Sequence, residues 1–196
     1  MGSDLTSSLR PAIVMTILFA LLLGFAYPLL ILGVGQTVFP SQANGSLVTD
    51  HGKVVGSTVI GQAFTSDRYF QTRPSAAGKG YDGTASSGSN FGPTSQPLID
   101  RVKADIKKRR SEGVSGPIPA DLVTASGSGL DPDLSPAAAL VQAPRVAKAR
   151  GLDETTVRAM VDGSVQHPLL GFIGEDHVNV FALNRQLDAL GGTKGP

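Results

Sequence analysis

The sequence of 196 residues contains no cysteine and has almost no net charge. The missing cysteine excludes disulfide frameworks, thiolate catalysis and cysteine-ligated zinc. Seventeen Lys and Arg residues are balanced by sixteen Asp and Glu residues, so the formal net charge is +1 at pH 7. Such a balance creates no strong field that would attract nucleic acid or acidic substrates. Cysteine chemistry and charge-driven binding are therefore both disfavoured.

Charge is also missing locally, because no charged residue occurs from Pro11 to Thr49. Within this gap, residues 12–34 are almost wholly apolar, and fourteen of these 23 residues are Leu, Ile, Val or Phe. A helix of that length would span roughly 35 Å, compared with about 30 Å for the hydrocarbon core of a bilayer. We therefore predict a transmembrane helix over residues 12–35, with a kink at Pro28. Membrane helices tolerate such a kink when neighbouring helices satisfy the carbonyl that it frees.

A cleaved signal peptide is the alternative for this region. Small residues stand at the spacing of a cleavage site in residues 24–26 and again in residues 41–43. However, the apolar run is longer than a signal-peptide core, which has about 7–15 residues. An uncleaved anchor is therefore the favoured interpretation.

The charges that flank the apolar run predict its orientation. Arg10 and the terminal amine lie on one side, and the first basic residue on the other side is Lys53. The positive-inside rule therefore places residues 1–11 in the cytoplasm and exports residues 36–196.

The exported body is predicted to be α+β, with short β-strands, long Gly/Ser-rich loops and several carboxy-terminal helices. Two β-rich runs flank a turn at residues 50–52 within residues 46–62. Residues 63–97 then form a polar stretch that aromatic side chains can order if they pack in a core. A helix is expected over residues 97–112, with Pro97 in its first turn.

The carboxy-terminal half is predicted to be mainly helical. The stretch TASGSGLDPDLSP (residues 124–136) leads into a helix that Ser135 caps, and Pro144 interrupts this helix. Gly151 ends the next one. The first predicted helix begins at Pro136, the second covers residues 145–150, and the third extends from Asp153 to about Val165. The fourth covers residues 180–190, where Val180, Leu183, Leu187 and Leu190 share one apolar face.

Several motif-like patterns do not meet the requirements of a site. GKGYDG (residues 78–83) matches G-x-G-x-x-G but lacks the strand and helix of a dinucleotide site. Asp131 and Asp133 lack the glutamate that an EF-hand needs at position 12, where Gln142 stands. The remaining candidates have no catalytic or metal-ligand spacing: Ser126, Ser128, His51, His167 and His177. We therefore predict no catalytic residue and no metal ligand.

Residues 144–161 (PRVAKARGLDETTVRAMV) carry the main alternative function. A helix, a turn at Gly151 and a second helix fit a helix-turn-helix, with Ala147 and Val157 facing inward. The chain could then be a membrane-anchored regulator that binds DNA. However, the body from residue 36 has sixteen basic and fifteen acidic residues, whereas DNA-binding domains are strongly basic. Two packed helices separated by a glycine are the favoured interpretation.

Seven blocks in a fixed order resemble the KdpC family, the C subunit of the Kdp potassium-transporting ATPase. Together they cover nearly the whole chain, after the apolar run. The blocks are FPSQANGSL (39–47), IGQAF (60–64), YFQTRPSA (69–76), GSNFGPT (88–94), DLVTASGSGLDPDLSPAAA (121–139), RVAKARGL (145–152) and VNVFALNRQLD (178–188).

The resemblance implies an accessory subunit of a bacterial inner-membrane complex, with its carboxy-terminal domain in the periplasm. Its partners would be the channel-like potassium subunit KdpA, the P-type ATPase subunit KdpB, the small subunit KdpF, and membrane lipid. The sequence has neither a DKTG phosphorylation motif nor a Walker A motif, so a non-catalytic role is expected. We expect two blocks, residues 42–47 and residues 69–76, to contact the channel-like subunit. The candidate contacts in them are Gln42, Asn44, Gly45, Ser46, Tyr69, Phe70, Arg73, Pro74 and Ser75.

The resemblance also implies a catalytic chaperone that raises the ATP affinity of KdpB, through a glutamine-containing signature. The corresponding segment here, Leu152–Thr156, contains no glutamine. An exported domain also does not meet cytosolic ATP. We therefore expect no covalently bound cofactor, and ATP, which the family implies, would be affected through coupling between sites rather than through direct contact.

Overall fold

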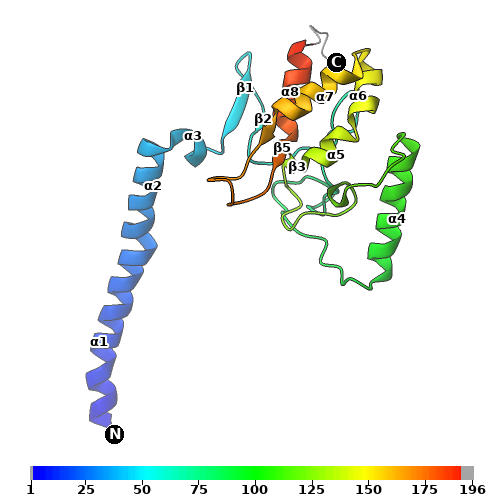
Figure 1. Ribbon diagram of the computed structural model, residues 1–196. Helices are drawn as coiled ribbons and strands as arrows, with labels where there is room; N and C mark the ends of the chain where they lie inside the picture. The colour runs from blue at the N-terminus through cyan, green and yellow to red at the C-terminus, as the bar shows by residue number, and fades with distance from the viewer. Residues whose placement is uncertain (1, 191–196) are drawn as a thin grey trace. The chain divides into compact units, whose positions relative to one another are not determined.

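The computed structural model describes residues 2–190 and contains two compact units, an amino-terminal unit that ends at Leu47 and a body that begins at Val48. The amino-terminal unit is a long helix followed by one short helix, and the body mixes helices with short strands (Figure 1). The predicted combination of helices and strands is confirmed.

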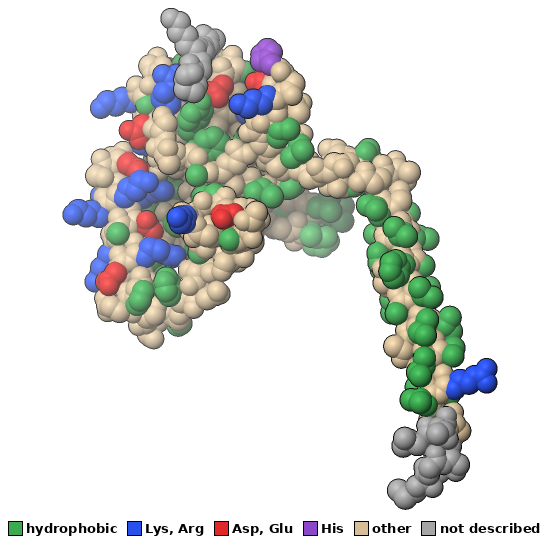
Figure 2. Space-filling model, turned by 180° about the vertical axis from the view of Figure 1, so that it is seen from behind, with side chains coloured by type: hydrophobic (Ala, Val, Ile, Leu, Met, Phe, Trp, Pro, Cys, Tyr) green, Lys and Arg blue, Asp and Glu red, His purple; other side chains and the backbone are tan. Residues whose placement is uncertain are grey.

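The long helix consists of α1 (Gly2–Leu21), a π-helical turn (Leu22–Ala26) and α2 (Tyr27–Val38). Its stretch from Ser7 to Val38 has 32 residues and contains an 18-residue window with a mean hydropathy of 2.5, so it is long and apolar enough to cross a membrane. Hydrophobic side chains cover this stretch, in which Arg10 is the one charged residue, whereas charged side chains are numerous on the body (Figure 2). The predicted apolar helix is therefore confirmed, and it continues three residues beyond the expected end at residue 35.

The π-helical turn ends at Ala26, two residues before Pro28. Tyr27 donates its backbone N–H to the carbonyl of Leu22, five residues earlier, in place of the usual partner four residues earlier. Proline has no N–H to donate, and its ring crowds the preceding turn of a regular helix. A wider turn relieves that crowding. The structure thus accommodates Pro28 locally, and a kink at this residue stays a prediction.

The first elements after the long helix are short. Helix α3 covers Pro40–Ala43, and strands β1 (Leu47–Asp50) and β2 (Lys53–Ser57) form a two-stranded sheet. Between the strands, His51 and Gly52 have φ values of +46° and +77°. Two successive positive φ angles are typical of a tight hairpin turn. The predicted pair of strands around residues 50–52 is confirmed.

The stretch from residue 58 to residue 95 contains no helix or strand. One of its aromatic side chains, Phe70, is nevertheless fully buried in the core. Helix α4 (Gln96–Ser111) follows, with Pro97 in its first turn and Gly113 at a φ of +96° beyond its end. This helix agrees with the prediction to within one residue at each end. A 3₁₀ turn covers Ala120–Leu122.

A three-stranded sheet in the body was not predicted. It has the order β3 (Asp133–Leu134), β5 (His177–Asn179), β4 (Val165–Gln166), and both pairs of strands are antiparallel. Strands of two or three residues are too short to show the alternation of polar and apolar residues from which strands are recognised.

Four helices complete the body: α5 (Pro136–Leu140), α6 (Ala143–Arg150), α7 (Glu154–Gly163) and α8 (Val180–Leu190). Ser135 caps α5 by accepting the N–H of Ala138 at 3.1 Å. Gly151 ends α6 with a φ of +68°. The order of the predicted helices is confirmed, but α5 ends at Leu140, so Pro144 lies in the first turn of α6 and does not interrupt a helix. Helix α7 ends two residues before the predicted Val165, and Leu190 is more than half exposed, unlike Val180, Leu183 and Leu187.

The core of the body lies where α5 to α8 meet the three-stranded sheet. Fourteen buried apolar residues form one cluster, to which Phe70 contributes from the irregular stretch and Leu122 from the 3₁₀ turn. Burial of this apolar surface stabilises the body, and it also fixes the path of the long irregular stretch.

Candidate partner-contact surface

The first predicted contact block, residues 42–47, lies at the end of α3 in the amino-terminal unit. The side-chain amide of Asn44 donates to the carbonyl of Pro40 at 2.6 Å. Gly45 and Ser46 have φ values of +86° and +49°, and Ser46 donates its N–H back to a carbonyl of α3 at 2.8 Å. The block is thus a closed turn with Gln42 and Asn44 exposed on it.

The second predicted block, residues 69–76, is an extended segment of the body that two buried amide side chains hold. Phe70 donates its N–H to Oδ1 of Asn184 at 2.8 Å and accepts from Nδ2 of the same side chain at 3.0 Å. Gln71 pairs in the same way with Gln142, at 2.9 and 3.0 Å. Each amide supplies the two hydrogen bonds that a neighbouring strand would otherwise provide.

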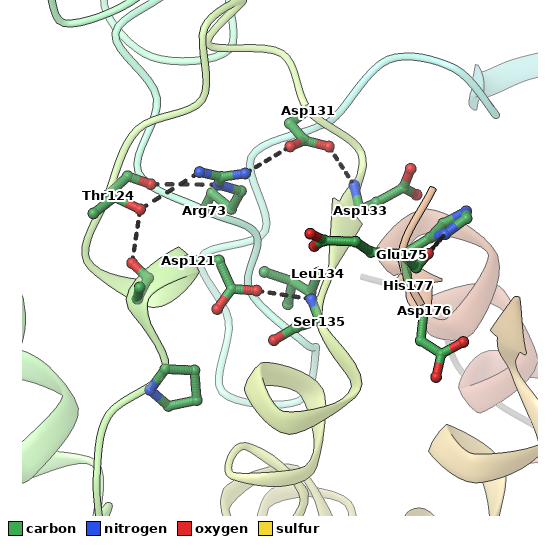
Figure 3. A pocket seen from close by; sticks show the side chains of 12 residues that line it. Arg73, Asp121, Thr124, Asp131, Asp133, Leu134, Ser135, Glu175, Asp176 and His177 are labelled. Atoms are coloured by element: carbon green, nitrogen blue, oxygen red, sulfur yellow. Dashed lines mark hydrogen bonds and ion pairs between the residues drawn. The ribbon is translucent and has the colours of Figure 1, made fainter. Parts of the chain in front are cut away.

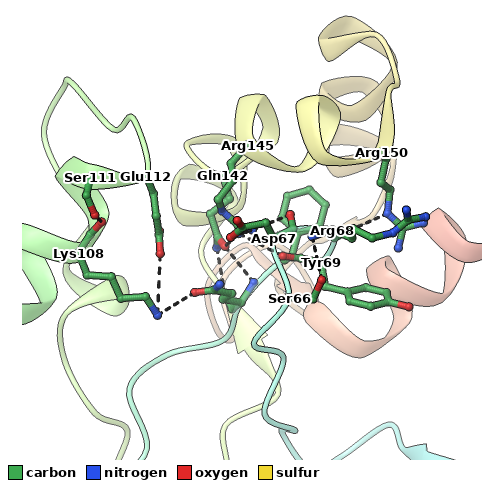
Figure 4. A network of polar contacts seen from close by, with 12 residues as sticks. Ser66, Asp67, Arg68, Tyr69, Lys108, Ser111, Glu112, Gln142, Arg145 and Arg150 are labelled. Atoms are coloured by element: carbon green, nitrogen blue, oxygen red, sulfur yellow. Dashed lines mark hydrogen bonds and ion pairs between the residues drawn. The ribbon is translucent and has the colours of Figure 1, made fainter. Parts of the chain in front are cut away.

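Arg145 holds the same segment from α6 (Figure 4). Its guanidinium donates to the carbonyls of Asp67 at 2.8 Å and Tyr69 at 3.1 Å, and to Oε1 of Gln142 at 2.8 Å. Burial lowers the pKa of Arg145 from its ordinary value, while Glu112 and Asp67 oppose that shift. The fixed geometry of a guanidinium allows one side chain to bind several carbonyls at once.

Arg150 is the second arginine on this segment. It donates to the carbonyl of Arg68 at 2.6 Å and to the carboxylate of Asp188 at 2.8 Å. Its guanidinium also lies 4.8 Å from the ring centre of Tyr69, whose hydroxyl donates to Asp188 at 3.1 Å. We refer to Gln142, Arg145, Arg150 and Asn184 together as the amide–arginine clamp.

The clamp changes the interpretation of the candidate contacts in the second block. Phe70 is 0% exposed, so it has no side-chain surface for a partner, and we no longer retain it as a contact. Its role is to fix the segment in the core. Tyr69 is half-buried against Arg150, and its role as a contact stays a prediction.

Arg73 and Ser75 join the second block to the loop at residues 124–131, and Figure 3 shows Arg73 beside Asp131 of this loop. Arg73 forms an ion pair with Asp131 at 2.9 Å, and the hydroxyl of Ser75 donates to the carbonyl of Gly129 at 2.6 Å. Pro74 lies between them and is half-buried. Gly129 has a φ of +67°, and a Cβ at this position would lie 2.6 Å from the carbonyl oxygen of Ser87. The Gly- and Ser-rich stretch at residues 124–136 is therefore a shaped loop packed on the second block.

A pocket of about 580 Å³ opens beside Arg73 (Figure 3). Burial raises the pKa of one of its carboxylates, Asp133, which also accepts from the amide of Asn179 at 3.0 Å. The basic residues that line the pocket are Arg73 and His177. The lining carboxylates are Asp121, Asp131, Asp133, Glu175 and Asp176.

Most of these carboxylates already have partners. Asp131 pairs with Arg73, Asp121 accepts the N–H of Ser135 at 2.7 Å, and Asp176 lies 2.8 Å from His167. Among residues 2–190, no group of three or more His, Cys, Asp or Glu side chains is arranged to hold a metal ion. Because carboxylates repel phosphate oxygens, the lining favours a cationic or neutral polar group over a nucleotide.

Helices α6 and α7 carry the segment for which DNA binding was considered. Ala147 and Val157 are buried as predicted, so the two helices pack on the core. Outside, Arg158 of α7 is paired with Glu154 at 2.7 Å, and Asp162 is exposed. The outer face of α7, where DNA would lie, therefore offers no unpaired cation to bind phosphates.

Residues 152–156, which correspond to the family's ATP-related signature, form the connection from α6 into α7. Asp153 precedes the first turn of α7, and its carboxylate accepts from the hydroxyl of Thr155, which lowers the pKa of Asp153. The connection is mostly exposed and contributes no lining to the pocket beside Arg73.

None of the four residues of the clamp was predicted to hold the second block. Asn184 carried a usable signal, because it stands on the predicted apolar face of residues 180–190, four positions after Val180. A polar residue on a buried face needs a hydrogen-bonding partner in the core. Gln142, Arg145 and Arg150 carried no comparable signal, since their partners in the segment lie at least 70 residues away.

Comparisons with known proteins give consistent results. A family model described as KdpC, K⁺-transporting ATPase, c chain, matches residues 9–189. The potassium-transporting ATPase KdpC subunit of Caulobacter vibrioides (strain NA1000 / CB15N) is 61% identical over 184 residues, which are 93% of each chain. The protein of the same name from Allorhizobium ampelinum is 56% identical over 189 residues, 96% of this chain and 99% of the relative. That from Methylobacterium nodulans is 53% identical over 196 residues, 94% and 98% of the two chains.

Proposed function

Since the chain belongs to the KdpC family of K⁺-transporting ATPase c chains, we propose that it is the anchored accessory subunit of an ATP-driven potassium uptake complex. The observation that carries this proposal is the family match over residues 9–189, which includes both the apolar helix and the body. In this role the chain assembles and stabilises the channel-like and ATP-hydrolysing subunits and performs no catalysis itself.

The proposed orientation places residues 1–11 in the cytoplasm, residues 12–35 in the bacterial inner membrane and residues 36–196 in the periplasm. Arg10 supports it, because it is the only basic residue that flanks the apolar run closely. With this topology the body meets the outer face of the channel-like KdpA. The ATPase KdpB and the small KdpF would contact the chain mainly through the membrane helix.

The proposed contacts with KdpA are the exposed and half-exposed residues of the two blocks. In the first block, Gln42 and Asn44 stand on a closed turn whose shape Gly45 and Ser46 define. In the second block, the clamp and the loop at residues 124–131 fix the surface on which Tyr69, Arg73, Pro74 and Ser75 lie. Fixed backbone geometry lowers the entropy that a surface loses when it docks.

The second part of the proposal concerns ATP. We infer that any increase in the ATP affinity of KdpB is a coupling between distant sites, carried by the membrane helix, and that this chain does not contact ATP. Two observations support the inference: the acidic lining of the pocket beside Arg73 disfavours phosphates, and residues 152–156 contain no glutamine.

The absence of cysteine makes the orientation directly testable. A single cysteine at the exposed position Thr155 should react in intact cells with a maleimide that crosses only the outer membrane. A cysteine at Ser8 should react only after lysis and serves as the control. Protection of position 155 until lysis would place the body in the cytoplasm and would overturn both the orientation and the indirect route to ATP.

The assembly role has its own test. Tagged full-length chain, purified in mild detergent, should bring with it a channel-like chain and a P-type ATPase, and its deletion should abolish potassium uptake at low external potassium. Recovery of the tagged chain without such partners would refute the proposed function.

A further inference from the structure

The connection between β4 and β5 concentrates strongly exposed large apolar side chains within five residues, more densely than any other segment of the described body. Leu169, Leu170, Phe172 and Ile173 are 69%, 76%, 75% and 53% exposed. In Figure 1 this connection, in orange, reaches out from the body as a narrow loop. We call residues 168–174 the apolar hairpin. Contiguous apolar surface of this kind marks an interaction site more often than isolated exposed residues do.

The apolar hairpin is held in one shape by its own hydrogen bonds. Leu169 and Ile173 exchange both backbone bonds, at 3.1 and 3.0 Å, and Gly171 donates its N–H to the carbonyl of Pro168 at 3.0 Å. At its base, His167 lies 2.8 Å from Asp176. The apolar side chains therefore project from a preformed hairpin, so little conformational entropy would be lost on docking.

This shape is unfavourable for the isolated chain. Leu170 has a φ of +56°, in the left-handed region that a bulky side chain rarely adopts. Glycine or asparagine would fit this position better. The chain thus combines backbone strain with a strongly exposed leucine, and an interaction that buries this side chain would offset both.

The charges around the apolar hairpin indicate what it binds. No Lys or Arg occurs from residue 159 to residue 184, whereas Asp162, Glu175 and Asp176 are acidic. Segments that insert into a lipid surface combine apolar residues with basic ones, which anionic headgroups attract. Acidic flanks would be repelled by such a surface. The surroundings therefore favour a protein partner with basic residues around an apolar pocket.

We propose that the apolar hairpin inserts Leu170 and Phe172 into an apolar pocket of a protein partner, and that Lys or Arg side chains around this pocket face Glu175 and Asp176. The partner is a protein of the potassium-transporting complex, so the proposal rests on the proposed function and adds to it a defined docking surface. This surface lies outside both blocks from which the candidate contacts were taken.

Substitutions in the full-length chain test the docking surface, with co-purification of partner chains as the readout. Leu170→Gly removes the side chain and relieves the strain, so the thermal midpoint of the purified chain should stay equal or rise. Leu170→Gly combined with Phe172→Ser should lower the recovered partner by at least tenfold. Leu170→Met should retain it. Val59→Ser, at a 58% exposed valine elsewhere on the body, is the matched control and should leave recovery unchanged.

Charge reversal separates a protein partner from lipid. Glu175→Lys should lower the recovery of partner chains severalfold, because the new cation faces basic residues. If the hairpin instead bound lipid, the same change would raise binding to vesicles that contain phosphatidylglycerol. A photoreactive amino acid at Phe172 should crosslink to a protein chain, and crosslinking only to lipid would overturn the proposal.

The result for the unsubstituted chain separates failure of the proposed function from failure of the proposed docking surface. If it recovers no potassium-transport chain, the proposed function fails, and the docking surface fails with it. If it recovers its partners and the doubly substituted chain recovers them equally well, only the docking surface is refuted. A tenfold loss with an unchanged thermal midpoint supports both.

Discussion

Two extended parts of the body are held in place by different means. In the three-stranded sheet, β5 pairs backbone to backbone with β3 and β4, in the registers Leu134–Val178 and Val165–Val178. The segment at residues 67–71 lies outside any strand, and its backbone groups pair with the side chains of the amide–arginine clamp.

The difference concerns which substitutions each part tolerates. Any residue except proline supplies the N–H and C=O that a strand pair requires. The clamp instead depends on particular amides and guanidinium groups, and the loss of one leaves buried backbone groups without partners. Single substitutions should therefore be much more costly in the clamp than at surface positions of the sheet.

Asn184→Ala should have the largest effect. It leaves the N–H and C=O of Phe70 without partners in a site where Asn184 itself is 1% exposed. Each unsatisfied buried group costs roughly 1–3 kcal/mol, so we expect a loss of about 3 kcal/mol in the free energy of unfolding. Urea unfolding of the full-length chain in detergent, followed by circular dichroism, measures it. A loss below about 1 kcal/mol would show that water replaces the amide.

Asn184→Asp is the control for this substitution, because an aspartate side chain has nearly the same size and shape as asparagine. An ionised carboxylate can accept from Phe70 but cannot donate to it, and burial raises the pKa of such a group. Only the protonated form restores both bonds. The stability of this variant should therefore be highest at low pH and fall as the pH rises through the raised pKa of the folded state. No such dependence is expected for Asn184→Ala.

Gln142→Glu should have a smaller effect, about 2 kcal/mol, because the amide nitrogen that donates to the carbonyls of Gln71 and Ala138 is lost while a neighbouring cation remains. Arg145 donates to Oε1 of Gln142 at 2.8 Å, and it would stabilise the new carboxylate. The same unfolding measurement checks this order. An effect larger than that of Asn184→Asp would mean that Arg145 does not compensate the buried charge.

Arg150→Lys tests the guanidinium geometry at a lower cost. A lysine can keep the ion pair with Asp188 but not also the bonds to the carbonyls of Arg68 and Leu187. We expect a loss of about 1 kcal/mol. Arg158→Lys, in the more exposed pair with Glu154, is the matched control and should change stability by less than about 0.5 kcal/mol. Equal effects of the two changes would argue against a special role of the clamp.

The sequence was sufficient to predict the helices, but it predicted neither the three-stranded sheet nor the segment that the clamp holds. Residues 97–112 and 180–190 were recognised because their apolar spacing and terminal residues are local signals. The strands of the three-stranded sheet have two or three residues each, too few for a pattern. The amide of Asn184 meets Phe70 across 114 positions, a relation that no local pattern contains.

The candidate contact surface was predicted only in outline, and for a similar reason. The two blocks came from a family resemblance, which identifies segments but not which of their side chains are exposed. Phe70 therefore appeared as a contact although it belongs to the core. The apolar hairpin was overlooked because a short apolar run does not differ in sequence from a buried strand.

Asp133→Asn should have the smallest effect, because Asp133 lies in β3, whose pairing its backbone provides. Burial raises the pKa of Asp133, so the folded state holds its proton more tightly than the unfolded chain does. The stability that this group contributes is therefore present below the ordinary pKa of a carboxyl and is lost as the pH rises through the raised value. An asparagine at this position cannot titrate but can still accept from Asn179. The substitution should remove that slope and change stability at neutral pH by no more than about 0.5 kcal/mol.

Asp82→Asn is the control of opposite sign for this pH dependence. Hydrogen bonds from Thr84 lower the pKa of Asp82, so its contribution is present above the ordinary value and is lost as the pH falls through the lowered one. Unfolding curves between about pH 3 and pH 7 should thus change slope in opposite directions for the two variants. Slopes that change in the same direction would show that desolvation does not govern Asp133, and that the pocket beside Arg73 is wetter than its geometry indicates.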